Sequence, residues 1–180
     1  MSNHKSFIMK GSKILLPAII LLLSISCPSL LPAQNTKADK EAEKKAHIRD
    51  MVESQTYDFI AQTAIPTTGR TRQITPDYDL QVSKTAVVSY LPYYGRAYSA
   101  PMDPTQSVGQ FTSKDFDYKI DPAKKGGWNI QIKPKDNREV QQLFLSIQES
   151  GYASLQVLYT NRQPISFNGY IKALKPKKSK

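Results

Sequence analysis

The sequence has 180 residues, a formal net charge of +10, one cysteine and two histidines. This length is enough for one domain with a sizeable hydrophobic core. The scarcity of cysteine and histidine excludes cysteine-rich zinc sites, multi-histidine metal sites and a Cys–His nucleophile. The sequence also lacks a P-loop and a glycine-rich dinucleotide-binding turn. We therefore expect neither a metal nor another cofactor.

Residues 1–33 have the pattern of a signal peptide that directs export. A positive segment with Lys5, Lys10 and Lys13 precedes an apolar run from Ile14 to Ile25. This run is too short to span a bilayer comfortably, so a single-pass anchor is the weaker interpretation. We therefore predict that the mature chain begins after residue 33.

Two processing sites compete in this leader. Cleavage after Ala33 leaves Gln34 at the new terminus and has a small residue at the cleavage position. The alternative is lipidation of Cys27, in Leu-Leu-Leu-Ser-Ile-Ser-Cys, which resembles a bacterial lipoprotein motif with its leucine one place too far away. We favour Ala33. Either route predicts an exported protein, periplasmic or in the outer envelope, and export removes nucleic acid as an expected partner.

Residues 34–54 are predicted to form a helix and a linker. The segment is rich in Lys, Glu and Ala, which favour helix, and we place the helix from about Lys37 to Ser54. Glu41 and Lys45 have the spacing of a supporting ion pair. One stripe has the spacing of a buried helical face: Ile48, Met51 and Val52.

Residues 55–174 alternate between apolar and polar positions in short runs, which is typical of strands with one buried and one wet face. Turns containing Gly, Pro or Asn separate these runs. Residues 139–148 fit a helix or a strand, and we choose a strand because Gly151 leads directly into another strand. The predicted fold is all-β, an antiparallel sandwich or open barrel of about eight strands with one N-terminal helix.

The inward positions of these strands predict the hydrophobic core. Trp128 is the largest of them, and its replacement by Ala is predicted to cost about 3–5 kcal/mol, as for other buried aromatic side chains. The predicted core consists of Phe59, Tyr78, Leu80, Val82, Phe116, Tyr118, Trp128, Ile130, Leu155, Val157 and Phe167.

The segment Leu91–Met102, which we call the tyrosine loop, is the main candidate binding site. Aromatic and arginine side chains dominate binding hot spots, and this loop concentrates both. Tyr93 and Tyr98 are expected to pack, whereas Tyr94 and Arg96 are expected to face solvent. Closure of one end of the core is the alternative role for this loop. The candidate ligand-binding residues are Tyr93, Tyr94, Arg96, Tyr98 and, as a second anion contact in a later turn, Arg162.

The alternative to a binding function is a carboxylate-based glycan hydrolase, and this alternative rests on two Asp-x-Asp pairs. Asp77 and Asp79 form one pair, and Asp115 and Asp117 form the other. A spacing of two places both carboxylates on one face of a strand, and a glycosidase needs two carboxylates around a sugar. The intervening aromatic residues point inward, so these aspartates are predicted to face water.

The last six residues, 175–180, form a basic tail. Such a tail is ordinarily solvated and without a specific role. The more specific interpretation is that it is weakly attracted to an anionic membrane surface. The lysines that would supply this attraction are Lys175, Lys177, Lys178 and Lys180.

Five motifs follow one another along the chain: LPYYGRAYSAP, FDYKI, KKGGWNIQIKPKD, GYASLQV and NRQPISFNGYI. Together they resemble an exported Gram-negative family known as domain of unknown function 4251, and the resemblance covers about residues Glu53 to Ile171. It implies an envelope protein with no assigned activity or catalytic residue. The family's usual signal ends before a Gln, which favours cleavage at Ala33. A non-catalytic module that binds a glycan, peptide or envelope protein is the preferred function.

Overall fold

The computed structural model describes residues 37–98 and 108–174. The predicted signal peptide, with Cys27 and Ala33, and the basic tail lie outside the described residues. One helix and ten strands follow one another along the chain: α1 Lys37–Glu53, β1 Tyr57–Pro66, β2 Arg72–Gln73, β3 Asp79–Val82, β4 Val87–Tyr90, β5 Gln110–Ser113, β6 Phe116–Pro122, β7 Trp128–Pro134, β8 Val140–Ile147, β9 Tyr152–Tyr159 and β10 Ile165–Ala173.

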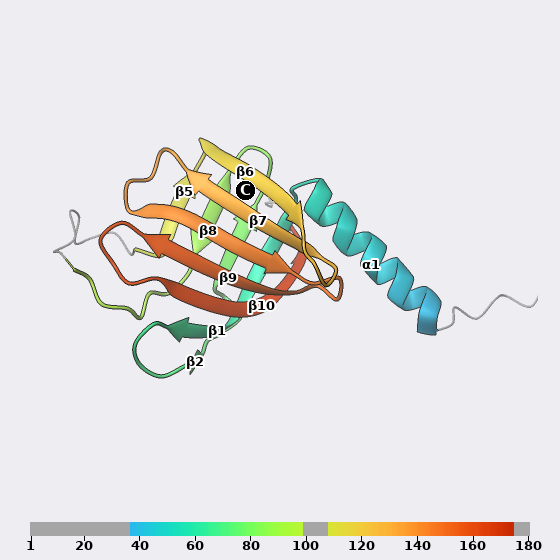
Figure 1. The fold of residues 1–180 in the computed structure, drawn as a ribbon, viewed down its shortest axis with the longest axis horizontal. Helices are drawn as coiled ribbons and strands as arrows, with labels where there is room; N and C mark the ends of the chain where they lie inside the picture. Colours follow the sequence, from blue (N-terminus) through green and yellow to red (C-terminus); the bar gives the residue numbers. More distant parts are fainter. Residues whose placement is uncertain (1–36, 99–107, 175–180) are drawn as a thin grey trace, which may run out of the picture. The chain divides into compact units, whose positions relative to one another are not determined.

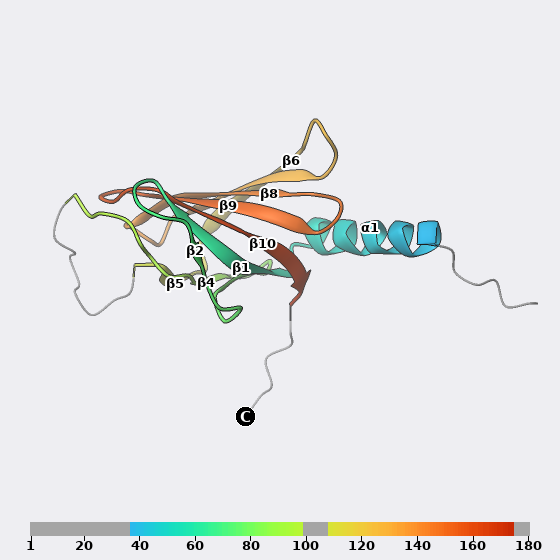
Figure 2. The same ribbon diagram turned by 90° about the horizontal axis from the view of Figure 1, so that it is seen from below.

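The strands form one antiparallel sheet that is nearly closed and barrel-like (Figure 1). The strand order is β5-β4-β3-β1-β10-β9-β8-β7-β6. The short strand β2 is not part of this order and pairs with β1. Figures 1 and 2 both show β6–β9 on one side and the strands β4 and β5 on the other, so the sheet curls over its own inner face. The predicted all-β antiparallel fold with one N-terminal helix is confirmed, and it takes the form of the open barrel.

Two sets of contacts hold the curled sheet together. The hydroxyls of Tyr57 in β1 and Tyr118 in β6 lie 3.2 Å apart, although β10, β9, β8 and β7 separate these strands in the sheet order. Asp136 accepts hydrogen bonds from the Ser113 hydroxyl and the Lys114 backbone N–H. These bonds lower the pKa of Asp136 and join the connection after β5 to the connection after β7.

The core lies between the two halves of the curled sheet. Part of the predicted core is confirmed, because these side chains are at most 1% exposed: Phe59, Leu80, Val82, Ile130, Leu155, Val157 and Phe167. Tyr78, Phe116, Tyr118 and Trp128 are instead partly buried against the core. Trp128 is the first residue of β7 and Phe116 the first of the edge strand β6, and strand ends are covered on fewer sides. Replacement of Trp128 should therefore cost less than predicted.

Strand β1 does not keep the predicted alternation of buried and wet positions. All five residues from Tyr57 to Ala61 are buried. Asp58 and Ile60, on the face opposite Phe59, are only 5% and 1% exposed. On this outer face, Asp58 lies opposite Lys172 of β10 and Gln81 of β3, and Ile60 lies opposite Tyr170 and Asp79, so both positions are flanked by long side chains. A carboxylate is thereby placed in a buried position.

The predicted helix is confirmed as α1, and its stripe of Ile48, Met51 and Val52 is buried in the core cluster. The ion pair of Lys45 is with Glu149 in the β8–β9 connection, at 2.9 Å, and not with the predicted Glu41. The docking of α1 brings this connection within reach of the lysine. No helix among the described residues is long and apolar enough to cross a membrane.

The strand predicted at residues 139–148 is confirmed as β8, whose burial alternates from Leu143 to Ile147. Two short strands were missed. β2 has two residues, and β5 has four. β5 pairs with β4 from Val87 to Tyr90. A strand of two residues, such as β2, gives too few alternating positions to be recognised in sequence.

Candidate functional site

The described part of the tyrosine loop, Leu91–Tyr98, is fixed to the connection between β9 and β10. Ala97 and Arg162 form an isolated antiparallel bridge. The Tyr98 N–H donates to the Asn161 carbonyl at 2.9 Å, and the Gln163 N–H donates to the Arg96 carbonyl at 3.1 Å. The backbone of the loop is therefore held in one position by its partner turn.

Tyr93 anchors the loop from the inside. Its hydroxyl lies 3.0 Å from the Gln163 carbonyl and 3.1 Å from the Arg96 carbonyl. Its ring packs edge-on against Tyr159, with centroids 5.2 Å apart. Burial raises the pKa of the Tyr93 hydroxyl, so the hydroxyl stays protonated and acts as a donor. The prediction that Tyr93 packs against the domain is confirmed.

Gly95 makes this anchor possible. A Cβ at this position would lie 2.3 Å from the Tyr93 hydroxyl oxygen and 2.5 Å from Cζ. Any other residue would push the ring away from its carbonyl acceptors. The glycine is therefore explained by the close approach of the tyrosine.

The outer side of the loop presents cationic and aromatic side chains. Arg96 is exposed, and Tyr98 is 70% exposed. The Arg72 guanidinium lies over the half-buried Tyr94 ring, 4.8 Å from its centroid. The expected packing of Tyr98 is wrong, because Tyr93 and Arg162 occupy the inner side of the loop. We call Arg72, Tyr94, Arg96 and Tyr98 the loop surface.

Arg162 contributes from the inner side. Its side chain is only 12% exposed and lies 3.7 Å from the Glu139 carboxylate. Its guanidinium also lies 5.8 Å from the centre of the Tyr93 ring. Arg162 therefore supports the anchor, and most of its surface faces protein rather than solvent.

The Asp-x-Asp pairs provide little that resembles a catalytic site. Asp115 and Asp117 are exposed, as is Asp77, and Asp117 forms an ion pair with Lys135. Asp79 is half-buried and accepts a hydrogen bond from the Gln81 amide at 3.0 Å. Within residues 37–98 and 108–174, no three His, Cys, Asp or Glu side chains gather as metal ligands would.

The carboxylate with an unusual environment is Asp58, which alternation did not identify. Its Oδ2 lies 3.4 Å from Lys172 Nζ, while its buried Oδ1 has no hydrogen-bond partner. Burial raises the pKa of Asp58, and the neighbouring carboxylate of Asp79 raises it further against the opposing effect of Lys172. The protonated form of Asp58 is therefore favoured relative to an ordinary aspartate.

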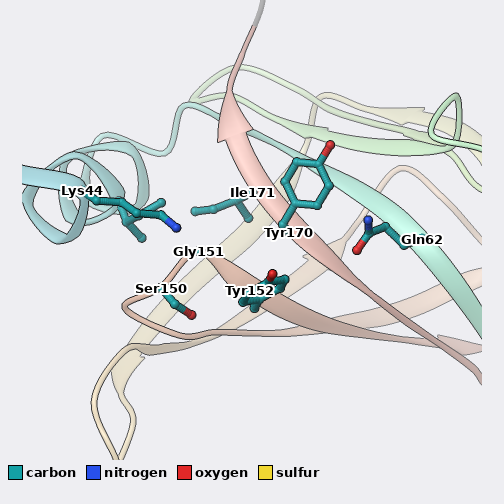
Figure 3. Close-up of a pocket in the computed structure, with 8 residues that line it drawn as sticks. Lys44, Gln62, Ser150, Gly151, Tyr152, Tyr170 and Ile171 are labelled. Atoms are coloured by element: carbon teal, nitrogen blue, oxygen red, sulfur yellow. The ribbon is translucent and has the colours of Figure 1, made fainter. Parts of the chain in front are cut away.

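A pocket of about 310 Å³ lies where α1 meets β9 and β10. Figure 3 shows Lys44 extending from α1 towards Ile171, with Tyr152 and Tyr170 on neighbouring strands. No local sequence pattern indicates this pocket, because the pocket forms only when α1 docks on the sheet. Its lining consists of Lys44, Ile48, Gln62, Ser150, Gly151, Tyr152, Tyr170 and Ile171.

Comparison with known proteins gives the family and the fold. The model of the family described as "Domain of unknown function (DUF4251)" matches residues 39–171. The crystal structure of a DUF4251 family protein from Bacteroides eggerthii DSM 20697 is similar, with a TM-score of 0.54 and 15% sequence identity. This similarity covers 73% of the present chain and 89% of the other. No curated protein matches the sequence.

Proposed function

We propose that this chain, which belongs to the DUF4251 family, a domain of unknown function, is a non-catalytic module that binds a partner through the loop surface. The observation that carries this proposal is the division of the tyrosine loop into two sides. Tyr93 faces inward and fixes the loop, whereas Arg96 and Tyr98 are exposed. A fixed backbone reduces the ordering cost of binding.

The chemistry of the loop surface favours an acidic polypeptide as the partner. Arg72 and Arg96 are exposed cations, and arginine binds carboxylates in a bidentate manner. Tyr98 adds a large amphipathic face of the kind that anchors protein interfaces. A glycan remains an outcome that the experiment below would identify.

The test compares the wild-type protein with the double variant Arg96→Ala, Tyr98→Ala. Each protein is immobilised, exposed to extract from its native cells, and the captured proteins are quantified by mass spectrometry. The wild-type protein is expected to enrich an acidic protein at least about tenfold over the variant, equivalent to 1.4 kcal/mol. Capture should weaken in high salt because charged contacts are screened.

Tyr93→Ala is the matched structural control. It should lower the free energy of unfolding by about 2 kcal/mol, since it removes buried packing and leaves carbonyls without their donor. The double variant should stay within about 0.5 kcal/mol of wild type per exposed substitution. Equal capture by wild type and double variant, or enrichment of glycan without protein, would contradict an acidic polypeptide partner.

We also propose that the protein is exported, to the periplasm or the outer envelope, and that cleavage occurs after Ala33. The positive segment and short apolar run of residues 1–33 support this proposal. Mass spectrometry of the protein from its native cells is expected to find Gln34 at the N-terminus. A diacylated Cys27 would identify a lipoprotein instead, and an intact Met1 would contradict cleavage of the leader. The basic tail would add weak attraction to an anionic membrane surface.

The alternative of a carboxylate hydrolase has less support. A glycosidase needs two carboxylates that both reach the sugar. Asp58 has the raised pKa expected of a general acid, but it is only 5% exposed. The predicted pairs are more accessible, yet Asp117 is engaged by Lys135. The binding module therefore accounts for more of the described features.

A further inference from the structure

The pocket between α1 and the sheet combines an apolar floor with polar walls. Ile48, Gly151 and Ile171 supply the floor. The walls carry the hydrogen-bonding groups of Gln62, Ser150, Tyr152 and Tyr170, and the ammonium group of Lys44 (Figure 3). An apolar surface surrounded by several convergent polar groups is the usual composition of a small-molecule site.

Local backbone features shape this pocket. Gly151 has a φ of +88°, and a Cβ there would lie 2.9 Å from Ile48 Cδ1, so glycine allows α1 to approach the floor. The register between β1 and β10 shifts between Ala61 and Thr63, so Gln62 occupies a β-bulge. Bulges redirect side chains and are common next to functional sites.

Two tyrosines form the aromatic wall. Tyr152 in β9 and Tyr170 in β10 are direct partners in the strand register, so their side chains project from the same face of the sheet. Tyr152 is 60% exposed, which leaves a large part of its surface accessible. An exposed tyrosine offers an apolar ring and a hydroxyl to the same ligand.

The electrostatic character of the pocket is cationic. Lys44 extends towards the pocket floor, whereas the neighbouring Lys45 is paired with Glu149. A second cavity of about 860 Å³ shares Ser150 with this pocket, and its charged lining residues are Lys45, Lys124, Lys125 and Glu149. An anionic ligand group is therefore favoured at the Lys44 side.

We propose that this pocket binds a saccharide unit that carries a carboxylate. The sugar ring stacks its C–H face on Tyr152, its hydroxyls bond to Gln62, Ser150 and Tyr170, and its carboxylate lies near Lys44. The volume of about 310 Å³ is at the small end of the range for ligand pockets, which favours one or two sugar units over a long acyl chain. This site is independent of the loop surface.

The test is calorimetric titration of the mature chain with three probes: a uronic-acid disaccharide, the neutral disaccharide of the same linkage, and acetate. The acidic disaccharide is expected to bind about tenfold more tightly than the neutral one, a difference of 1.4 kcal/mol. Lys44→Gln should remove this preference without weakening the neutral probe. Tyr152→Ala should weaken both disaccharides by about tenfold.

Two controls make the outcome decisive. Lys133→Gln changes an exposed lysine in β7 outside the pocket lining and should leave all titrations unchanged. Arg96→Ala, Tyr98→Ala should also leave them unchanged, which separates this site from the proposed function. An unchanged preference in Lys44→Gln, acetate binding as tight as the acidic disaccharide, or no disaccharide binding by the wild-type protein would overturn the proposal.

Discussion

Replacing Phe167 by Ala is expected to lower the free energy of unfolding by about 3–5 kcal/mol, the cost of removing a fully buried aromatic side chain. Phe167 is 0% exposed and lies in β10, which pairs with β1 on one side and β9 on the other. The surrounding strands cannot collapse into the space without losing their register, so a cavity remains.

Trp128→Ala is the matched comparison, because tryptophan is larger but Trp128 is only partly buried. Its cost should be smaller than that of Phe167→Ala, and urea unfolding of both variants measures the difference. A larger loss for Trp128→Ala would show that the rim of the sheet, and not its centre, supplies most of the packing energy.

Asp58→Asn is expected to stabilise the protein at neutral pH by about 1–3 kcal/mol, the cost of an unsatisfied buried polar group. The groups that face Asp58 are Lys172 from β10 and Asp79 from β3. An Asn amide is neutral, so the substitution places no second negative charge beside the Asp79 carboxylate.

The pH dependence follows from the raised pKa of Asp58. Below the ordinary pKa of an aspartate, both the folded and the unfolded chain are protonated at this position and the stability is fully present. As the pH rises towards the raised folded pKa, the unfolded chain releases its proton first, so stability is lost. Asp58→Asn should remove this loss, and the difference between the two stability curves isolates it.

Asp121→Asn is the control, because Asp121 pairs with Lys119 on the surface and exposed pairs contribute little. Urea unfolding from pH 4 to pH 8 is the measurement for all three proteins. If Asp58→Asn is less stable than wild type at neutral pH, then the ion pair with Lys172 outweighs the cost of burying Asp58, and the expected stabilisation is wrong.

Alternation predicted most of the sheet, because a strand with one buried face repeats its pattern every two residues. Alternation gave wrong predictions where a strand does not have one buried and one exposed face. In β1, both Asp58 and Phe59 are buried, because long side chains on β10 and β3 flank the outer face of this strand. Trp128 was placed too deep, since periodicity gives the side of a strand that a residue faces but not its distance from the end of the sheet.

The candidate sites show a similar division. Composition alone identified the tyrosine loop, because three tyrosines and an arginine lie within its twelve residues. The pocket at Lys44 and Tyr152 joins residues more than a hundred positions apart, so no local pattern indicates it. The orientation of Tyr98 was also beyond local reasoning, because it depends on a bridge to Arg162 in a distant turn.

The most direct test of the central claim is site-specific photocrosslinking on the loop surface. A benzophenone amino acid replaces Tyr98 in one protein and Ser154 in another, and both positions are exposed. Irradiation in native cells is expected to give a discrete protein adduct from position 98 only, and adding Arg96→Ala should remove it. Equal adducts from both positions, or none from position 98, would contradict recognition through the tyrosine loop.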